Sequence, residues 1–318
     1  MRISTIGTLG LTLAFTFIIQ DGSAFGSTKY KCKNPACDIN AIGHRKFFKS
    51  PSVGNWYSTE KEKELGEKYS TAVEHRVVLV KDAGINAYVD HVAQRITRNS
   101  DADMPITVRI VRRDDPGAFT LYGGHLYLTT GLLLKLHSEG ELASVLARGI
   151  AHTAVRSVAR LQTRTSLMEV ASIPGNIGVF AIDSVPHAPA NNDIALQALG
   201  SLKLQRDLEL EADYFGIQYV YKAGYDTDCF VSAVQSFWQP NPSGALAKAF
   251  YPFPPLNERL KKLHQEIDDI LPNRPGDVVT TSEFDEFMSR LRQIPPPEST
   301  PDKDGLPKLV RDDTPARN

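Results

Sequence analysis

Five stretches of the chain have the pattern of helices. A charged stretch starts at Thr59, and four stretches with apolar residues at helical spacing cover residues 85–96, 138–158, 194–222 and 256–267. Such spacing buries one face of a helix against a core. Thr59 with Glu62, and Ser138 with Glu141, form the Ser/Thr-x-x-Glu pattern in which a hydroxyl caps the first turn of a helix. The chain is therefore predicted to be mostly helical.

Three short stretches between residues 106 and 129 have the pattern of strands. Apolar and polar residues alternate over 106–110 and 118–121, and a third stretch, 125–129, follows a pair of glycines. Alternation with a period of two buries one face of a strand, and paired glycines mark a tight turn. Residues 172–192 contain Gly and Pro without periodicity and are predicted to form a loop. Together these patterns predict an α+β arrangement with a small sheet among helices.

The first 24 residues have the order of a secretory signal. Arg2 is followed by a mostly apolar run to Ile19 and then by Gly22-Ser23-Ala24, which matches the charged, apolar and small-residue parts of such a signal. The alternative is an uncleaved anchor, but four threonines interrupt the run, and a spanning helix needs about 20 predominantly apolar residues. We therefore predict an exported protein without a firm membrane anchor once residues 1–24 are removed.

Two unpatterned flanks surround the predicted elements. Residues 25–56 lack sustained periodicity and are predicted to be an extended N-terminal segment. Cys32 and Cys37 within it are expected to form a local disulfide in an oxidising compartment. Residues 293–318 place many prolines among charges and are predicted to be a disordered tail. Cys229, the third cysteine, is expected to be a small buried residue without chemistry.

Composition and charge remove two classes of partner. Of the 318 residues, 42% are hydrophobic and 23% are charged, which is the range of ordinary globular proteins. The 36 Lys and Arg residues are balanced by 37 Asp and Glu residues, so the net charge is −1. A chain without an excess of positive charge has no general attraction to nucleic acid or anionic lipid. We expect neither as a partner.

Candidate chemistry lies on the helix of residues 138–158. Zinc peptidases of the zincin type carry His-Glu-x-x-His on a helix, and residues 148–152 here read Arg-Gly-Ile-Ala-His. Only His152 matches, and a histidine among apolar residues is more often a packed core side chain than a ligand. Glu209 and Asp213 lie one turn apart on a later helix, so one carboxylate could bind a metal and the second could support it. Acidic pairs at this spacing more often face solvent.

Taken together, these segments resemble the CAAX-prenyl-protease-type family of zinc metallopeptidases, and within it the bacterial periplasmic branch of β-barrel assembly-enhancing proteases. The segments that carry the resemblance are Asn99–Asp101, Pro105–Val108, Gly117–Gly124, Thr130–Leu132, Glu141–Arg156, Glu209–Gly216, Ala223–Asp226 and Pro254-Pro255 with Arg259. They follow the family's order and span nearly all of residues 57–292. The resemblance implies one mostly helical, zincin-like domain over these residues, with a small β-sheet beside the active-site helix, in a periplasmic protein.

The resemblance also implies roles for individual residues. In the family, two histidines and a later glutamate bind zinc, and the Glu after the first His activates water. His152 and Glu209 keep ligand positions, and Asp213 keeps the position of a supporting carboxylate. The first His position holds Arg148, which has no lone pair to offer a metal. The position of the catalytic base holds Gly149, which has no side chain to accept a proton.

Two remaining protein ligands are fewer than the three of catalytic zinc, so zinc is expected to be absent or weakly bound. Phe253 stands where the periplasmic branch has a histidine that reaches toward the metal. His125 could lend a donor, and with Tyr127 it is assigned to the strand that would hold substrate. In place of the metal, Arg148 is expected to cross the vacated space and make a bidentate pair with Glu209.

Three functions remain compatible with these residues. The first is a pseudoprotease that binds extended or unfolded polypeptide by strand addition, without cutting it, in envelope protein quality control. The second is a residual zinc metalloendopeptidase that uses His152, Glu209 and a borrowed ligand such as His125. The third is a structural scaffold with a filled cleft. The loss of a zinc ligand together with the base favours the first.

Overall fold

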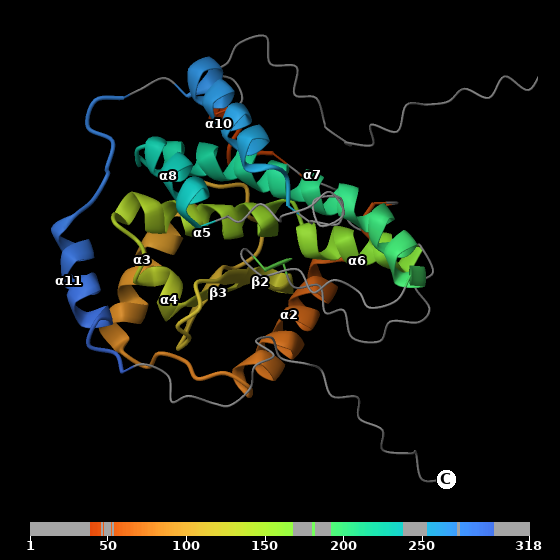
Figure 1. Ribbon diagram of the computed structural model, residues 1–318, viewed down its shortest axis with the longest axis horizontal. Helices are drawn as coiled ribbons and strands as arrows, with labels where there is room; N and C mark the ends of the chain where they lie inside the picture. The colour runs from red at the N-terminus through yellow and green to blue at the C-terminus, as the bar shows by residue number, and fades with distance from the viewer. Residues whose placement is uncertain are drawn as a thin grey trace, which may run out of the picture. The chain divides into compact units, whose positions relative to one another are not determined.

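The computed structural model describes residues 39–45, 47, 52, 54–167, 180–181, 192–237, 253–271 and 274–295, which all lie in one structural unit. Its helices are α2 (Thr59–Glu74), α3 (Ala83–Thr97), α4 (Thr130–Leu133), α5 (Glu139–Ala154), α6 (Ser157–Leu167), α7 (Asn192–Lys222), α8 (Asp228–Phe237), α10 (Leu256–Ile270) and α11 (Ser282–Leu291) (Figure 1). The mostly helical α+β class predicted from the sequence is confirmed.

Within the described residues, the small sheet has four strands in the order β1-β3-β2-β4. They are β1 (Thr107–Val111), β2 (Ala118–Thr120), β3 (His125–Thr129) and β4 (Phe180–Ala181). β1 is parallel to β3, whereas β2 is antiparallel to both β3 and β4. The first three strands match the sequence prediction. The predicted loop over residues 172–192 was wrong at Phe180–Ala181, because these two residues pair with β2.

Helix α5 forms the centre of the fold and lies between the sheet and α7 (Figure 1). Every residue from Glu139 to Ala154 is buried. The predicted cap is confirmed, since Ser138 Oγ accepts a hydrogen bond from the Glu141 N–H at 3.1 Å. A helix buried on all sides has little room for change, because each side chain meets a neighbouring element.

The long helix predicted over residues 138–158 is in fact two helices. α5 ends at Ala154 and α6 begins at Ser157, and between them Arg156 takes a left-handed conformation with φ 57°. Such a conformation is uncommon for a residue with a side chain and is retained where surrounding contacts fix it. Here Arg156 Nε donates to Glu62 Oε1 at 2.7 Å and both side chains are buried. The apolar spacing continues across the break, so periodicity alone could not reveal it.

The start of α2 also differs from the sequence prediction. The capping residue is Ser58, whose Oγ accepts a hydrogen bond from the Lys61 N–H at 3.1 Å, so the helix begins at Thr59 rather than being capped by it. Glu62 is therefore free for the buried pair with Arg156. Burial raises the pKa of Glu62, although the positive charge of Arg156 counteracts this effect.

Part of the N-terminal segment is docked on the domain rather than extended. Ile42 belongs to the main hydrophobic core. Arg45 is buried and donates from Nε to Asp101 Oδ2 at 2.9 Å and from Nη1 to Gln218 Oε1 at 2.7 Å. Tyr219 donates to the same carboxylate oxygen at 3.0 Å. We call Arg45, Asp101, Gln218 and Tyr219 the Arg45 cluster.

Helix α11 was not predicted, although Thr281 and the apolar residues that follow it have the pattern of a capped helix. Thr281 Oγ1 accepts from the Phe284 N–H at 3.3 Å and also donates to Glu139 Oε2. The hydroxyls of Tyr88 and Tyr225 donate to Glu139 as well, each at 2.8 Å. One buried carboxylate at the start of α5 thus holds α3, the residues before α8, and the cap of α11.

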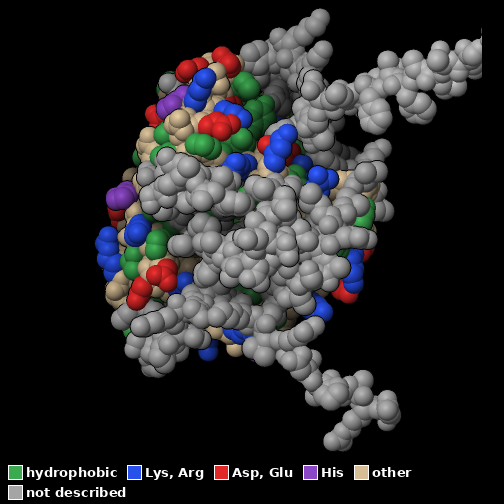
Figure 2. Space-filling view, turned by 45° about the vertical axis from the view of Figure 1, so that its right-hand side comes forward, with side chains coloured by type: hydrophobic (Ala, Val, Ile, Leu, Met, Phe, Trp, Pro, Cys, Tyr) green, Lys and Arg blue, Asp and Glu red, His purple; other side chains and the backbone are tan. Residues whose placement is uncertain are grey.

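Several sequence predictions lie outside the described residues. These are the signal over residues 1–24, the disulfide between Cys32 and Cys37, and the tail from residue 296 onward. Cys229 is a free, buried cysteine, as expected. Among the described helices, none has both the length and the hydropathy to cross a membrane. On the face shown in Figure 2, the described acidic and basic side chains are interspersed with apolar ones.

Candidate functional site

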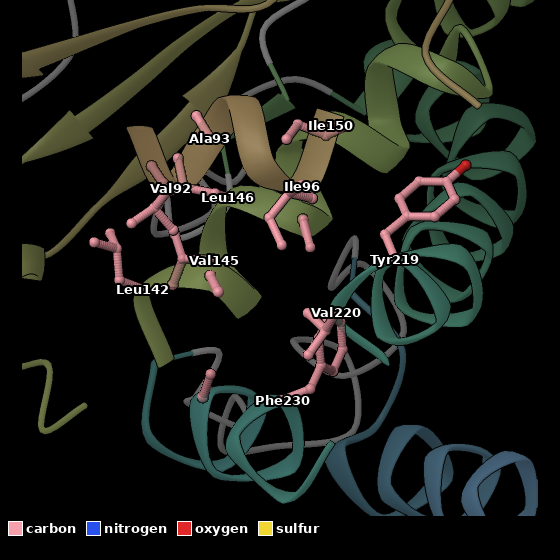
Figure 3. Packing of buried hydrophobic residues seen from close by; sticks show 14 of the residues in the cluster. Val92, Ala93, Ile96, Leu142, Val145, Leu146, Ile150, Tyr219, Val220 and Phe230 are labelled. Carbon is pink, nitrogen blue, oxygen red and sulfur yellow. The ribbon is translucent and has the colours of Figure 1, made fainter. Parts of the chain in front are cut away.

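The positions singled out in the sequence meet where α5 packs against α7. Arg148 and His152 lie one turn apart on α5, and Glu209 and Asp213 lie one turn apart on α7. Arg259 reaches the same place from α10. All five side chains are buried, with exposed fractions of 0–3%. Apolar side chains of α3, α5, α7 and α8, shown in Figure 3, make up the neighbouring core.

Close contact between α5 and α7 depends on Gly216. A Cβ atom at Gly216 would lie 2.9 Å from Phe230 Cε2 and 3.4 Å from the Arg148 Cα atom. A larger residue would therefore press on the ring and on the backbone of α5. The small residue allows the two helices to approach closely enough for Arg148 to reach the carboxylates of α7.

The guanidinium of Arg148 bridges two carboxylates. Its Nη2 donates to Glu209 Oε2, and its Nε donates to Asp213 Oδ1 at 2.9 Å. The predicted contact between Arg148 and Glu209 is confirmed. The prediction that both oxygens of Glu209 would be used was wrong, because Asp213 is within reach and takes the second donor.

A second arginine completes the charge balance. Arg259 donates from Nε to Asp213 Oδ2 at 2.7 Å and from Nη2 to Asp213 Oδ1 at 2.8 Å, which is the bidentate geometry. Two guanidinium charges thus face the carboxylates of Glu209 and Asp213. We call Arg148, Glu209, Asp213 and Arg259 the α5–α7 cluster. Burying four charges is tolerable here because each has a partner of opposite sign.

The charges also determine the protonation of their neighbours. Burial would raise the pKa of Asp213, but the positive charges of Arg259 and Arg148 outweigh this effect and lower it below its usual value. Burial, and then the nearby charge of Arg148, lower the pKa of His152 well below the usual value. His152 is therefore neutral at pH 7. Its Nδ1 lies 3.0 Å from Ser157 Oγ, and its Nε2 lies 3.8 Å from Glu209 Oε1.

These residues do not fit a zinc ion. Zinc in a catalytic site takes lone pairs from three protein ligands and leaves one position for water. The guanidinium of Arg148 carries a permanent positive charge and takes one oxygen of Glu209 and one of Asp213, so a cation beside these carboxylates would meet a like charge. Within the described part of the chain, no group of three or more His, Cys, Asp or Glu side chains is arranged to hold a metal.

The position of the catalytic base is closed by packing. A Cβ atom at Gly149 would lie 2.6 Å from Leu126 Cδ2 and 3.4 Å from Thr120 Oγ1. The first of these distances is shorter than real contacts, so a side chain at residue 149 would have to displace Leu126. Leu126 of the sheet therefore packs against the backbone of α5 at the position of the catalytic base.

Comparison with known proteins identifies the family. The model for peptidase family M48 matches residues 81–267, which is more than half of the chain. The chain belongs to peptidase family M48. A Vibrio cholerae protein named as a beta-barrel assembly-enhancing protease is 32% identical over 181 residues, which are 55% of this chain and 37% of that protein.

Two further relatives match this chain at lower identity. The beta-barrel assembly-enhancing protease of Escherichia coli K12 is 25% identical over 180 residues, 55% of this chain and 37% of that protein. The mitochondrial metalloendopeptidase OMA1 of Schizosaccharomyces pombe is 27% identical over 188 residues, 58% of this chain and 52% of that protein. The chain thus spans less than two fifths of the length of these beta-barrel assembly-enhancing proteases.

The strand assigned to substrate is not available in this M48 chain. β3 is hydrogen-bonded to β1 on one side and to β2 on the other, so His125 and Tyr127 cannot receive an added strand. The outer edge of β2 is itself paired with β4 at Phe119 and Thr120. Strand addition at these positions was a wrong expectation, because it overlooked that β3 runs through the middle of the sheet.

His125 and Tyr127 are engaged with α2 instead. His125 Nε2 lies 3.7 Å from Glu67 Oε1, and burial lowers the pKa of this histidine. Tyr127 donates to Glu74 Oε1 at 3.2 Å. The structure does not bring His125 to the α5–α7 cluster, so it is not a borrowed ligand there. Phe253 is half-buried just before α10.

Sequence reasoning missed the roles of Arg259 and Leu126. Arg259 was recognised as part of the family resemblance, but no function was inferred for it. A usable signal existed, because Arg259 lies three residues after Leu256 and four before Leu263, on the apolar face of α10. A charge at such a position needs a buried partner. Leu126 has no comparable signal, since one leucine in a buried strand looks like any other.

Proposed function

We propose that this M48 chain is a catalytically inactive member of its family that binds extended polypeptide in protein quality control of the cell envelope. The observation that carries the proposal is the Arg148 guanidinium, which holds Glu209 and Asp213 where a zinc site would need free carboxylate oxygens. A permanent cation between the two carboxylates opposes the binding of a dication.

Loss of the catalytic base also opposes peptidase activity. A zinc peptidase activates water with the metal and removes its proton with a carboxylate. Gly149 cannot accept that proton, and the loss of a general base typically costs about 10² to 10⁴ in rate. Leu126 packs against Gly149, so a side chain at residue 149 would have to displace it. Both elements of the peptidase reaction are therefore missing.

The polypeptide and the compartment are inferred from two separate features. Residues 1–24 have the pattern of a secretory signal, which supports export. Relatives of the chain are named for enhancing the assembly of β-barrels, which supports an unfolded β-barrel precursor as the class of polypeptide to test. Such binding would use a surface other than β3, whose two edges are already paired.

A second candidate is a structural scaffold without polypeptide binding. The packing of Leu126 into the base position favours it, because a filled cleft has no role in holding a substrate. A residual zinc peptidase is not favoured by the geometry, since the third ligand that it requires would have to come from His125, which lies against α2.

Metal content and cleavage test the proposal first. We expect the purified protein to contain much less than one zinc per chain, and casein to remain intact over hours in its presence. A His152→Ala variant and a chelator should change neither result. One zinc per chain that is lost in His152→Ala, or cleavage that stops with chelator, would overturn the proposal.

Binding separates the two remaining candidates. Fluorescence anisotropy with a labelled, urea-unfolded β-barrel protein should show saturable binding on dilution into buffer with this protein. A folded soluble protein with the same label serves as the control. Absence of saturable binding, together with absence of zinc, would leave the scaffold.

A further inference from the structure

The second half of α2 covers one face of the small sheet. His125 and Tyr127 lie two residues apart on β3, so their side chains point to the same face. Tyr127 donates to Glu74 Oε1 at 3.2 Å and packs with Val73 in one apolar cluster. We call residues 66–74 of α2 the cover segment. It separates this face of β3 from water.

The imidazole of His125 lies directly under the first residue of the cover segment. A Cβ atom at Gly66 would lie 2.5 Å from the Tyr122 carbonyl oxygen and 2.9 Å from His125 Cδ2. A residue with a side chain could not approach the sheet this closely, so glycine is needed here. His125 is buried as a result. Water can surround its ring only when the cover segment moves off the sheet.

The charged groups around His125 do not compensate for the water that its ring has lost. Glu67 Oε1 lies 3.7 Å from His125 Nε2, but the Glu67 side chain is 77% exposed, so solvent weakens the attraction. Glu74 is engaged with Tyr127 and with Arg109, whose Nε lies 3.4 Å from its Oε1. Arg109 disfavours a second positive charge nearby. Burial, the largest effect, therefore lowers the pKa of His125.

We propose that the interface between the cover segment and β3 is an acid-sensitive contact, in which a proton on His125 favours the state with the sheet uncovered. A solvated imidazole binds a proton below about pH 6.5, whereas the covered ring resists the charge. A proton bound mainly by the uncovered state shifts the equilibrium toward that state. Uncovering exposes the stacked rings of Tyr127 and Phe119, whose centroids are 4.7 Å apart. This contact is independent of the lost peptidase activity.

The start of α2 provides a fixed end for such a movement. Arg156 Nε donates to Glu62 Oε1 at 2.7 Å, and both side chains are 3% exposed. Asn55 donates to the same oxygen at 3.2 Å. Burial raises the pKa of Glu62, so uptake of a proton by this carboxylate favours the folded state and cannot produce the response expected of His125.

Amide hydrogen exchange of the full-length protein at pH 7 and pH 5 tests the proposal. Rates are expressed as protection factors, which removes the pH dependence of the chemical exchange step. The amides of Ser70 and Val73, within the cover segment, should lose protection by about three- to 25-fold at pH 5. The upper value is the limit for a ring that is protonated only when uncovered. The Leu146 amide of α5 should remain better protected than both.

Two histidine variants identify the group responsible. His125→Gln should abolish the loss of protection at Ser70 and Val73, whereas His75→Gln, at the exposed C-cap of α2, should keep it. If His125→Gln does not fold, NMR titration of the unaltered protein replaces it, and the His125 ring should titrate at a lower pH than in the same chain in urea.

Four results would overturn the proposal. The first is equal protection of the cover segment at both pH values, and the second is a loss that persists in His125→Gln. The third is a His125 titration that is the same with and without urea. The fourth is equal protection in α2 and α5 at pH 5, because this would mean that the whole domain unfolds together.

Discussion

Two groups of buried arginine and carboxylate side chains each include residues of α7, and they differ in what surrounds the charges. In the α5–α7 cluster, two guanidinium groups face two carboxylates, and all four side chains come from helices of the core. In the Arg45 cluster, one arginine from the N-terminal segment meets Asp101, which also accepts from the neutral Tyr219 hydroxyl and from the Gly43 N–H at 2.7 Å.

The comparison shows that a buried ion pair does not by itself indicate a lost catalytic site. The Arg45 cluster attaches the N-terminal segment to the domain. The Arg45 guanidinium also lies 4.8 Å from the centre of the Phe215 ring, so several contacts together hold this segment in place. The α5–α7 cluster occupies the positions that the family resemblance assigns to zinc. Burial of arginine is common to both clusters, so it is the position within the family pattern that connects one of them to lost catalysis.

The largest effect is expected when the carboxylates of the α5–α7 cluster are removed. Asp213→Ala leaves two buried guanidinium groups short of a partner and should lower the free energy of unfolding by about 5 kcal/mol, with about 3 kcal/mol for Glu209→Ala. Urea denaturation measures both. Glu64→Ala, in an exposed pair on α2, is the control and should change stability by less than about 0.5 kcal/mol. Equal, small effects of all three variants would show that the buried cluster contributes no stability.

A double replacement tests whether Arg148 and Glu209 stabilise the fold as a pair. Arg148→Met with Glu209→Leu removes the charges together and keeps similar volumes, so it should cost far less than the sum of the single changes. Strict additivity in this cycle would contradict the pairing of Arg148 with Glu209.

Arg45→Ala should have a smaller and more local effect. Detachment of the N-terminal segment exposes Asp101 to water, so the carboxylate is solvated rather than stranded, and we expect a loss of about 2 kcal/mol. Hydrogen exchange should become fast at Ile42 while the α5 amides stay protected. Fast exchange throughout α5 in this variant would show that the Arg45 cluster supports the whole core.

The pH dependence should report His152. Near pH 7 this residue is neutral in both the folded and the unfolded chain and has no effect. Because its folded pKa is lowered, the unfolded chain binds a proton that the folded chain does not once the pH falls below about 6.5. Stability should then fall by about 1.4 kcal/mol per pH unit. Stability measured by urea denaturation at pH 7, 6 and 5 should depend less steeply on pH in His152→Gln than in the unaltered chain, and an unchanged slope would contradict the lowered pKa of His152.

The smallest expected effect concerns Gly149. Alanine in a helix interior is favoured over glycine by about 1 kcal/mol, but overpacking against Leu126 costs about 1 to 3 kcal/mol. Gly149→Ala should therefore be destabilising by about 1 kcal/mol. In a Leu126→Ala background the same change should become stabilising. If Gly149→Ala is stabilising in the unaltered chain, the base position is not closed.

Sequence patterns recovered most elements because apolar spacing and capping are local properties. The helix of residues 194–222, the three strands before it and the Ser138 cap could all be inferred from neighbouring residues. The break at Arg156 could not, because Val155 and Val158 both remain buried on either side of it. The break depends on the pair of Arg156 with Glu62, which lies 94 residues earlier in the chain.

The candidate site was predictable only where the family resemblance supplied positions. The meeting of Arg148 with Glu209 followed from those positions. The second bond of Arg148, to Asp213, could not be predicted, because it depends on which carboxylate oxygens lie within reach of the guanidinium in the folded chain. The place of β3 in the middle of the sheet also escaped prediction, because strand order is a property of the whole fold.

The carboxylate of Glu139 has a consequence for where this domain ends. The match to the M48 family model stops at residue 267, yet Thr281 from beyond that boundary donates to Glu139 at the start of the central helix. The buried apolar face of α11, with Phe284, Phe287 and Met288, packs on the same core. A protein trimmed at the family boundary would lose a hydroxyl donor to a buried charge and uncover apolar surface of α3. The folding unit therefore extends about one helix beyond what the family has in common.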